Sequence, residues 1–311
     1  MSELWNGILT YLQAHWPDAK HFFNSIFFTA IAGSFAGAFA GAVAAQRIAN
    51  KTRNKDELLK EIRATNAATM IAFGVCNSIL LAKKQHIVAL RESFNQHRVA
   101  ARAAIAAQQA GHGDVFEFLG DFRTFDILSL PLPILQTQVF EKLSVQGRPL
   151  LLLTTLDQSV GGLNEAIRKR NQLVETFKAR PPSPSPSPAS SEFLALYFGF
   201  PFQGRTDQQY SDTIEAMYKQ ADDAIWFSAK LCSDLTAHGD QLSVTFKNKF
   251  GNGAPRIHKP DFTKATEENL MPSDDDYGDW LRMFVKRPAS LSRRDRVWRS
   301  LRRVVKSADD A

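Results

Sequence analysis

The sequence lacks the residue patterns that enzymes and metal-binding proteins usually carry. Its two cysteines, Cys76 and Cys232, lie far apart and match no metal or redox spacing, so we expect both to be small core residues. Its seven histidines form no HxxxH or HxH pair, which predicts neither a metal site nor a cofactor. Because the chain carries no catalytic signature, we expect a protein that is not an enzyme.

Two short segments have some features of ligand sites but lack the necessary context. Residues 251–253 read Gly-Asn-Gly among basic residues, yet they lack the preceding strand, the following helix and the GK[ST] ending of a P-loop. Residues 274–276 are three adjacent aspartates without EF-hand spacing. Both segments are predicted to be surface turns.

Charged side chains are missing from residues 22–45, between Lys20 and Arg47. A helix over these residues is about 36 Å long, enough to cross a hydrocarbon core about 30 Å thick. The pattern predicts a transmembrane helix over 22–46. The residues before it lack the basic n-region of a cleaved signal peptide, so we expect an uncleaved signal anchor.

Small side chains recur along this helix at intervals of four residues and form one face, opposite a face that carries Phe35 and Phe39. Small residues let two helix backbones approach closely in lipid. We therefore predict that the helix self-associates into a homo-oligomer. The self-association face is Thr29, Gly33, Gly37, Gly41 and Ala45.

The flanking cations predict the orientation of the crossing. One cation precedes the run, whereas six follow it within residues 47–63. The positive-inside rule therefore places the C-terminal side in the cytoplasm of a single-pass inner-membrane protein. Residues 1–21 then form an extracytoplasmic amphipathic segment, whose Trp5 and Trp16 suit the outer interface.

A second crossing over residues 64–82 is the competing topology. This stretch has nineteen uncharged residues, but Thr, Asn and Ser interrupt it. A buried helix in a soluble bundle explains the same composition, and we favour the single crossing.

The cytoplasmic part is predicted to be all-α. It divides into a helical region over 47–180, an extended Pro/Ser linker over 181–190 and a second helical region over 191–285. Because residues 42–110 contain no proline and only Gly74, we expect the membrane helix to continue into the cytoplasm. We also expect the two regions to pack as one composite bundle. The face with 3-and-4 spacing comprises Leu58, Ile62, Thr65, Thr69, Ala72, Cys76 and Ile79.

Further helices are expected on both sides of the linker. Two lie before it, over residues 134–143 and about 153–177, and residues 161–162, Gly-Gly, mark either a break or a close helix crossing in the second. A third is expected to begin with Asp212 and Glu215 as a capping pair and to end at Gly239. A period-2 pattern occurs over 242–246, the one stretch with strand character.

Arg91 and His97 are weak catalytic candidates. An arginine followed a few residues later by a histidine on one helix resembles the active motif of HEPN-type ribonucleases. The resemblance covers two residues, and it implies a helical fold that cleaves RNA phosphodiesters. Six residues of separation place the two side chains on different sides of a regular helix.

The C-terminal tail, residues 286–311, contains nine Lys or Arg and three Asp, so it accounts for the net charge of +6. Basic amphipathic helices with Trp lie on anionic membrane surfaces, which favours lipid binding over nucleic-acid binding because only one aromatic is interleaved. The lipid-binding residues are Arg293, Arg294, Arg296, Trp298, Arg299, Arg302, Arg303 and Lys306.

These patterns favour a membrane-anchored, self-associating helical scaffold, sensor or assembly component. Its expected partners are a second copy of itself, an anionic membrane surface and a protein that binds the cytoplasmic domain. Two alternatives remain at this point: an oligomeric membrane-permeabilising effector and a membrane-tethered HEPN-like ribonuclease.

Overall fold

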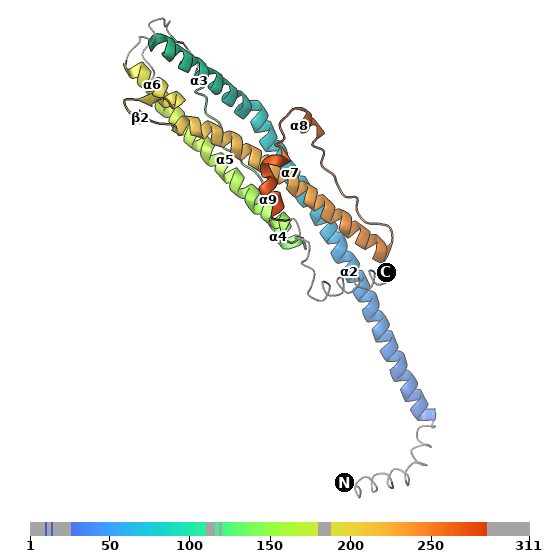
Figure 1. Cartoon of the computed structure of the whole chain (residues 1–311). Coiled ribbons are helices and arrows are strands. Elements are labelled where there is room, and N and C mark those ends of the chain that lie inside the picture. The colour runs from blue at the N-terminus through green and yellow to red at the C-terminus, as the bar shows by residue number, and fades with distance from the viewer. Residues whose placement is uncertain are drawn as a thin grey trace, which may run out of the picture. The chain divides into compact units, whose positions relative to one another are not determined.

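The computed structural model describes residues 26–109, 116–117, 120–179 and 188–284, together with residues 10 and 14. The structure is 79% helical and 2% strand, which confirms the predicted all-α class (Figure 1). The helices are α2 (Ile26–Ala82), the π-helix η1 (Lys83–Ile87), α3 (Val88–Gln109), α4 (Leu132–Lys142), α5 (Arg148–Ala179), α6 (Pro188–Phe198), α7 (Gln209–Phe250), α8 (Thr263–Glu267), the 3-10 helix η2 (Asp274–Tyr277) and α9 (Gly278–Arg282). Two short strands, β1 (Pro201–Phe202) and β2 (Arg205–Thr206), form an antiparallel hairpin.

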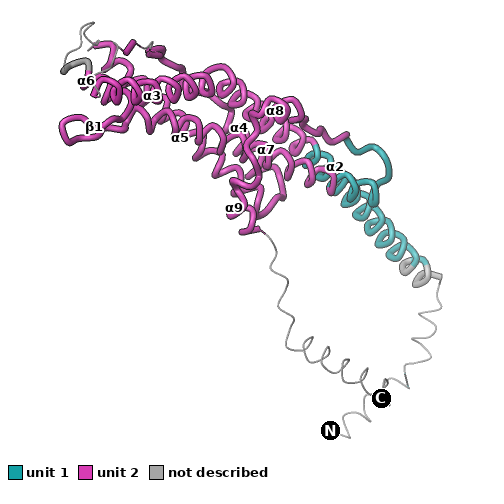
Figure 2. Tube along the Cα trace, turned by 45° about the horizontal axis from the view of Figure 1, so that its top comes forward, with its two compact units in different colours: residues 1–62, 242–255 teal, residues 63–241, 256–311 magenta. Residues whose placement is uncertain are grey.

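The chain divides into two compact units (Figure 2). The first comprises residues 1–62 and 242–255, and the second comprises residues 63–241 and 256–311. Helices α2, η1 and α3 follow one another without interruption, so the backbone stays helical from Ile26 to Gln109. This continuity follows from a stretch that lacks proline and contains only one glycine after residue 41.

In the first unit, the beginning of α2 is exposed. Every side chain from Gly33 to Glu57 is exposed except that of Val43, which is half-buried. Among the described side chains of this unit, those of Ile62 and Phe246 are buried. Phe246 contacts Phe250 with ring centroids 5.3 Å apart.

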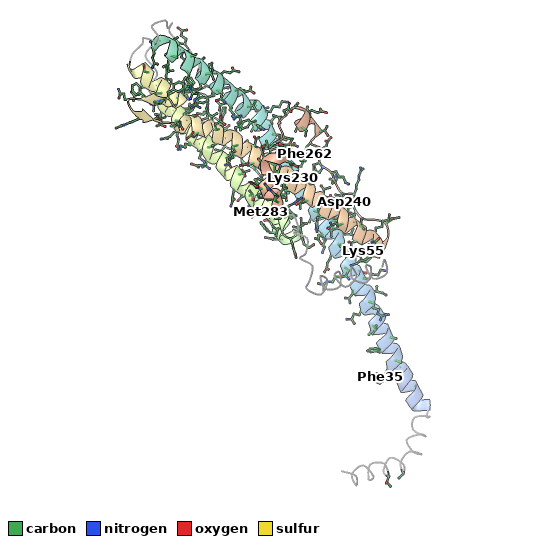
Figure 3. The ribbon with its side chains drawn as sticks, in the orientation of Figure 1. Phe35, Lys55, Lys230, Asp240, Phe262 and Met283 are labelled. Atoms are coloured by element: carbon green, nitrogen blue, oxygen red, sulfur yellow. The ribbon has the colours of Figure 1, made fainter. Side chains whose placement is uncertain are left out.

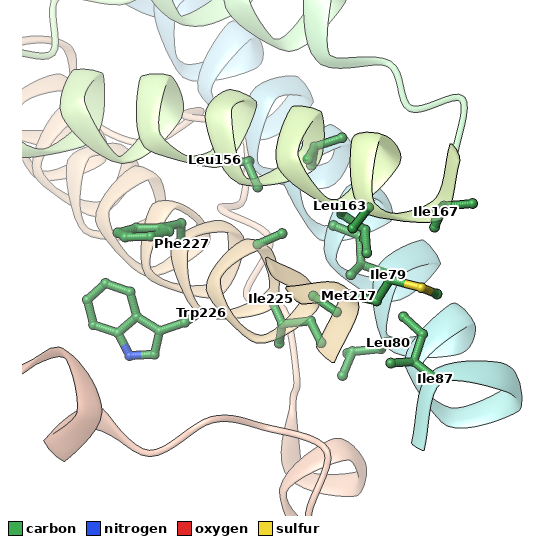
Figure 4. Packing of buried hydrophobic residues seen from close by; sticks show 14 of the residues in the cluster. Ile79, Leu80, Ile87, Leu156, Leu163, Ile167, Met217, Ile225, Trp226 and Phe227 are labelled. Atoms are coloured by element: carbon green, nitrogen blue, oxygen red, sulfur yellow. The ribbon is translucent and has the colours of Figure 1, made fainter. Parts of the chain in front are cut away.

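In the second unit, one hydrophobic core joins the end of α2 with η1, α3, α4, α5, α6 and α7. The predicted 3-and-4 face of α2 is buried in this unit, at Thr65, Thr69, Ala72, Cys76 and Ile79. Figure 4 shows how Ile79 from α2, Leu163 from α5 and Met217 from α7 pack together. Burial of each such side chain stabilises the bundle by about 1.5–3 kcal/mol.

Residues on both sides of the Pro/Ser segment contribute to this core. Leu156 and Leu163 precede the segment, and Phe198 and Tyr210 follow it. The prediction that the whole of 181–190 is extended is wrong at its end, because α6 begins at Pro188. A proline in the first turn of a helix leaves no backbone hydrogen bond unmade, so it can start α6. Residues 180–187 lie outside the described part of the chain.

Helix α7 also differs from the expectation at both ends. Asp207, rather than the pair Asp212 and Glu215, caps its beginning: the Asp207 carboxylate accepts the amide of Gln209 at 2.9 Å. The helix passes through Gly239 to Phe250, so the predicted strand-like stretch 242–246 is helical. Gly239 stays in the helix because a side chain there would lie 2.9 Å from Ile257 Cδ1, and the missing Cβ makes room for that contact.

Helix α5 has no break at its glycine pair. A Cβ on Gly162 would lie 2.7 Å from the Gln220 side chain of α7, so this glycine marks a close helix approach, the second of the two alternatives.

Side chains of α5 also bind the backbone of the irregular segment 120–131. Asn171 bonds both the amide and the carbonyl of Phe125, at 3.0 and 2.7 Å, and Asn164 bonds both groups of Leu128, at 2.8 and 3.0 Å.

Arg170 extends this attachment into the core. Its side chain is fully buried and donates to the carbonyls of Arg123 at 2.6 Å and Asp121 at 2.9 Å. Its guanidinium lies 4.4 Å from the centroid of the Phe125 ring. The segment therefore satisfies its backbone groups with α5 side chains in place of a strand partner.

Candidate functional site

The predicted self-association face lies on the exposed part of α2. A Cβ built on Gly33, Gly37 or Gly41 meets nothing within 4 Å, and Ala45 is exposed. The side chain of Thr29 lies outside the described residues. On the same part of the helix Phe35 and Phe39 are 72% and 73% exposed, and Figure 3 shows Phe35 standing clear of other side chains.

Among the described residues, one helix is long and apolar enough to cross a membrane, judged by length and composition alone. This helix, Gly33–Gln109, contains an 18-residue window with a mean hydropathy of 1.4, and 44% of that window is buried. Since residues 33–50 contain no buried side chain, the window lies further along, in the stretch considered above as a second crossing. A core helix of a soluble bundle passes the same test, and the burial of Ala72, Cys76 and Ile79 gives this stretch that role.

The most site-like feature of the bundle is a network of charged and aromatic side chains around the Tyr218 ring of α7. It begins at η1, the π-helix between α2 and α3. Single π-helical turns often occur at functional positions because the extra residue changes the direction of the side chains. The first residue of this turn, Lys83, lies on the buried side of the helix between Ile79 and Ile87, and only 3% of its side chain is exposed.

The Lys83 ammonium is bound by groups from two other parts of the chain. It forms an ion pair with Asp222 of α7 and donates to the carbonyl oxygen of Leu270 at 2.9 Å. Its Nζ lies 5.0 Å from the centroid of the Tyr218 ring. Burial raises the pKa of Asp222, and the neighbouring Lys83 ammonium offsets part of that rise.

Arg91, a residue of α3, contacts the ring of the same tyrosine. Its guanidinium lies 4.1 Å from the Tyr218 centroid and bonds both carboxylate oxygens of Glu215 at 3.0 Å. His97, the other predicted catalytic residue, has Ser93 as a neighbour, with Nδ1 3.4 Å from the hydroxyl oxygen. The structure therefore gives the two candidates different neighbours, and it joins Arg91 to the network through Tyr218.

An aromatic cluster on α7 lies next to this network. The Trp226 and Tyr277 rings stack with centroids 4.1 Å apart, and the Tyr277 hydroxyl donates to Asp223 at 2.8 Å. Burial is the main cause that raises the pKa of Tyr277. The indole of Trp226 donates to Asp274 at 2.9 Å, and Lys230 binds the same carboxylate at 2.7 Å.

The chemistry available to this network is the binding of one part of the chain to another. Each cation described above faces a carboxylate, a carbonyl or an aromatic ring. Within the described ranges, no group of three or more His, Cys, Asp or Glu could hold a metal ion. Both cysteines are buried in the core, and burial raises the pKa of the Cys76 thiol to about 11.

The remaining predicted segments have structural roles. Residues 251–253 form the turn after α7, where Gly251 and Gly253 have φ of +80° and +116°. Of the three aspartates, Asp274 anchors the chain to α7, as described above, within the 3-10 helix η2. The predicted lipid-binding tail, residues 286–311, lies outside the described residues.

The sequence contained one signal for Lys83 that the prediction did not use. The buried positions 72, 76, 79, 83, 87, 90 and 94 keep the 3-and-4 spacing of the core face, and Lys83 is the one charged residue among them. A charged residue on a core face marks a specific polar contact, because burying it without a partner is costly. Nothing in the local pattern identified its partners, Asp222 and Leu270.

Comparisons with known proteins give no family assignment: no family model matches the chain, and neither the curated proteins nor the solved structures contain a match.

Proposed function

We propose that the protein is a single-pass membrane protein that self-associates through its transmembrane helix and works as a scaffold, sensor or assembly component. The observation that carries this proposal is the exposed, uncharged beginning of α2. Its glycine face and its Phe35 and Phe39 side chains meet no other part of the described chain. Large apolar side chains on a bare helix are unfavourable in water and favourable in lipid.

The proposed topology places the N-terminus outside the inner membrane and the bundle in the cytoplasm. The uninterrupted helix from Ile26 to Gln109 supports a sensor or assembly role. A helix without a break transmits a rotation or a shift along its length, so association of the membrane segments can alter the bundle. The predicted binding of the tail to anionic lipid would hold the cytoplasmic part to the membrane at a second point.

Oxidative cross-linking tests this function in native membranes. A Gly37→Cys variant should form disulfide-linked dimers, because the two copies of residue 37 would face each other. The matched Ala42→Cys variant should not, since residue 42 lies about 140° around the helix from residue 37. The native Cys76 and Cys232 add little background because both are buried and their thiol pKa values are raised.

Equal cross-linking at both positions, or none at either, would contradict the proposed face.

A leak of small solutes on overexpression that Gly37→Leu abolishes would favour the permeabilising effector over the scaffold. For the tail, an isolated 286–311 peptide should float with anionic liposomes. The peptide is used because the intact chain, anchored by its transmembrane helix, would float whether or not its tail binds lipid.

A further inference from the structure

The C-terminal strap, which we define as residues 256–284, is fastened to the bundle differently from the helices. The strap contains only short helices, α8, η2 and α9, joined by irregular segments (Figure 1). Of its 29 residues, all described, just Ile257 and Leu270 are buried. Its other apolar side chains that pack against the core, such as Phe262, Tyr277 and Trp280, are only partly buried. Segments with fewer fully buried side chains open at a lower free-energy cost than the core to which they bind.

Polar contacts hold the strap at both ends, together with the packing of Phe262 on Phe73 and of Tyr277 on Trp226. Near its beginning, the Asn66 side chain of α2 binds the carbonyl of Arg256 at 2.9 Å and the amide of His258 at 3.1 Å. Near its end, Asp274 accepts from Trp226 and Lys230, at 2.9 and 2.7 Å.

Two adjacent lysines hold the middle of the strap, and they differ sharply in environment. Lys83 is almost fully buried and binds the Leu270 carbonyl as well as Asp222. Lys84 has 51% of its side chain exposed and binds Glu268 at 2.7 Å on the surface. A charged hydrogen bond inside the protein contributes much more than an exposed ion pair, whose contribution is screened by water and salt.

We propose that the strap is a latch that opens and closes as one unit, and that Lys83 is the residue that holds it shut. In the closed state the Leu270 carbonyl completes the partners of the buried ammonium. Opening removes that partner and uncovers Trp226, while the core between α2, α5 and α7 stays packed. When open, the strap can extend to a length of at most about 100 Å between Pro255 and the tail, a consequence for membrane reach that rests on the proposed function.

Hydrogen exchange measured by mass spectrometry on the full-length protein in detergent micelles tests the latch. Strap peptides should exchange faster than α5 peptides in the unaltered protein. Lys83→Met should accelerate strap exchange by about 10- to 100-fold, from the loss of a buried charged hydrogen bond. The matched Lys84→Met variant should change it by less than about threefold. Exchange in α5 should be the same in all three proteins.

Two results of that experiment would overturn the proposal. Unchanged strap exchange in Lys83→Met would show that this residue does not hold the strap. Acceleration of α5 by the same factor as the strap would show that Lys83 stabilises the whole bundle instead of a latch.

A substitution within the strap tests whether the segment opens as one unit. This substitution leaves every residue of the bundle unchanged. Asp274→Asn weakens the contacts with Trp226 and Lys230 at the far end. If the strap is one unit, peptides around Ile257 and Leu270 should exchange faster by the same factor as peptides around residue 274. Acceleration confined to residues 271–284 would contradict cooperative opening.

Discussion

Replacing Gly37 with leucine is the perturbation that separates self-association from folding. A Cβ at this position meets nothing within 4 Å, so the larger side chain creates no clash within the chain. Leucine also has a higher helix propensity than glycine, by about 0.7 kcal/mol, so the helix itself should not weaken. Any loss of assembly in Gly37→Leu is therefore a loss of contact between copies.

The size of that loss follows from close packing. Two helices that meet at glycines approach more closely than the 8–10 Å typical of helices with larger side chains at the contact. A leucine on both copies forces them apart and removes on the order of 10–20 atom pairs, each contributing about 0.1–0.2 kcal/mol. The sum is about 1–4 kcal/mol, which predicts a dimerisation constant weakened by at least about fivefold.

Förster transfer between labelled copies in liposomes, measured over a range of protein-to-lipid ratios, gives the dimerisation constant. The control is Ala42→Leu, which adds a leucine to an exposed position about 140° away around the helix. The dimerisation constant should be weaker for Gly37→Leu and unchanged for Ala42→Leu. The glycine-face explanation is refuted if the two variants behave alike.

Three other predictions concern the bundle. Asn171→Ala removes both hydrogen bonds to the Phe125 backbone and should lower the free energy of unfolding by about 2–3 kcal/mol. Circular dichroism should show this as a fall in Tm of about 4–12 °C. The control variant Gln172→Ala, on the exposed side of α5, should have little effect. The hydrogen bond from Lys230 is the main cause that lowers the pKa of Asp274 below its usual 3.8. The contribution of Asp274 to strap attachment is therefore present above about pH 4 and is lost as the pH falls through the lowered pKa. Tryptophan fluorescence should show this acid transition, and Asp274→Asn should lack it. The purified protein should leave RNA intact, and cleavage that His97→Ala abolishes would contradict the proposed scaffold function.

Local periodicity was sufficient to predict the helical class and the buried face of α2. The 3-and-4 spacing through Thr65, Ala72 and Ile79 identifies a core face because helical geometry alone places those side chains together. The same reasoning ended α7 too early at Gly239. Glycine costs about 1 kcal/mol inside a helix, and the compensating contact with Ile257 comes from a residue that periodicity does not relate to it.

The polar attachments could not be predicted in this way. Asn164 and Asn171 are two helical turns apart, but their partners are backbone groups of an irregular segment, which leave no pattern in the sequence. The partners of Lys83 are equally non-local, since Asp222 and Leu270 lie far along the chain. Long-range polar contacts of this kind depend on the tertiary fold, and residue spacing does not encode them.

The number of copies in the membrane-embedded protein tests the central claim most directly. Native mass spectrometry of the full-length protein released from nanodiscs gives that number without a label or a mutation. We expect a defined oligomer of two or more copies, reduced toward the monomer by Gly37→Leu. A monomer at every protein-to-lipid ratio would contradict self-association through the exposed helix.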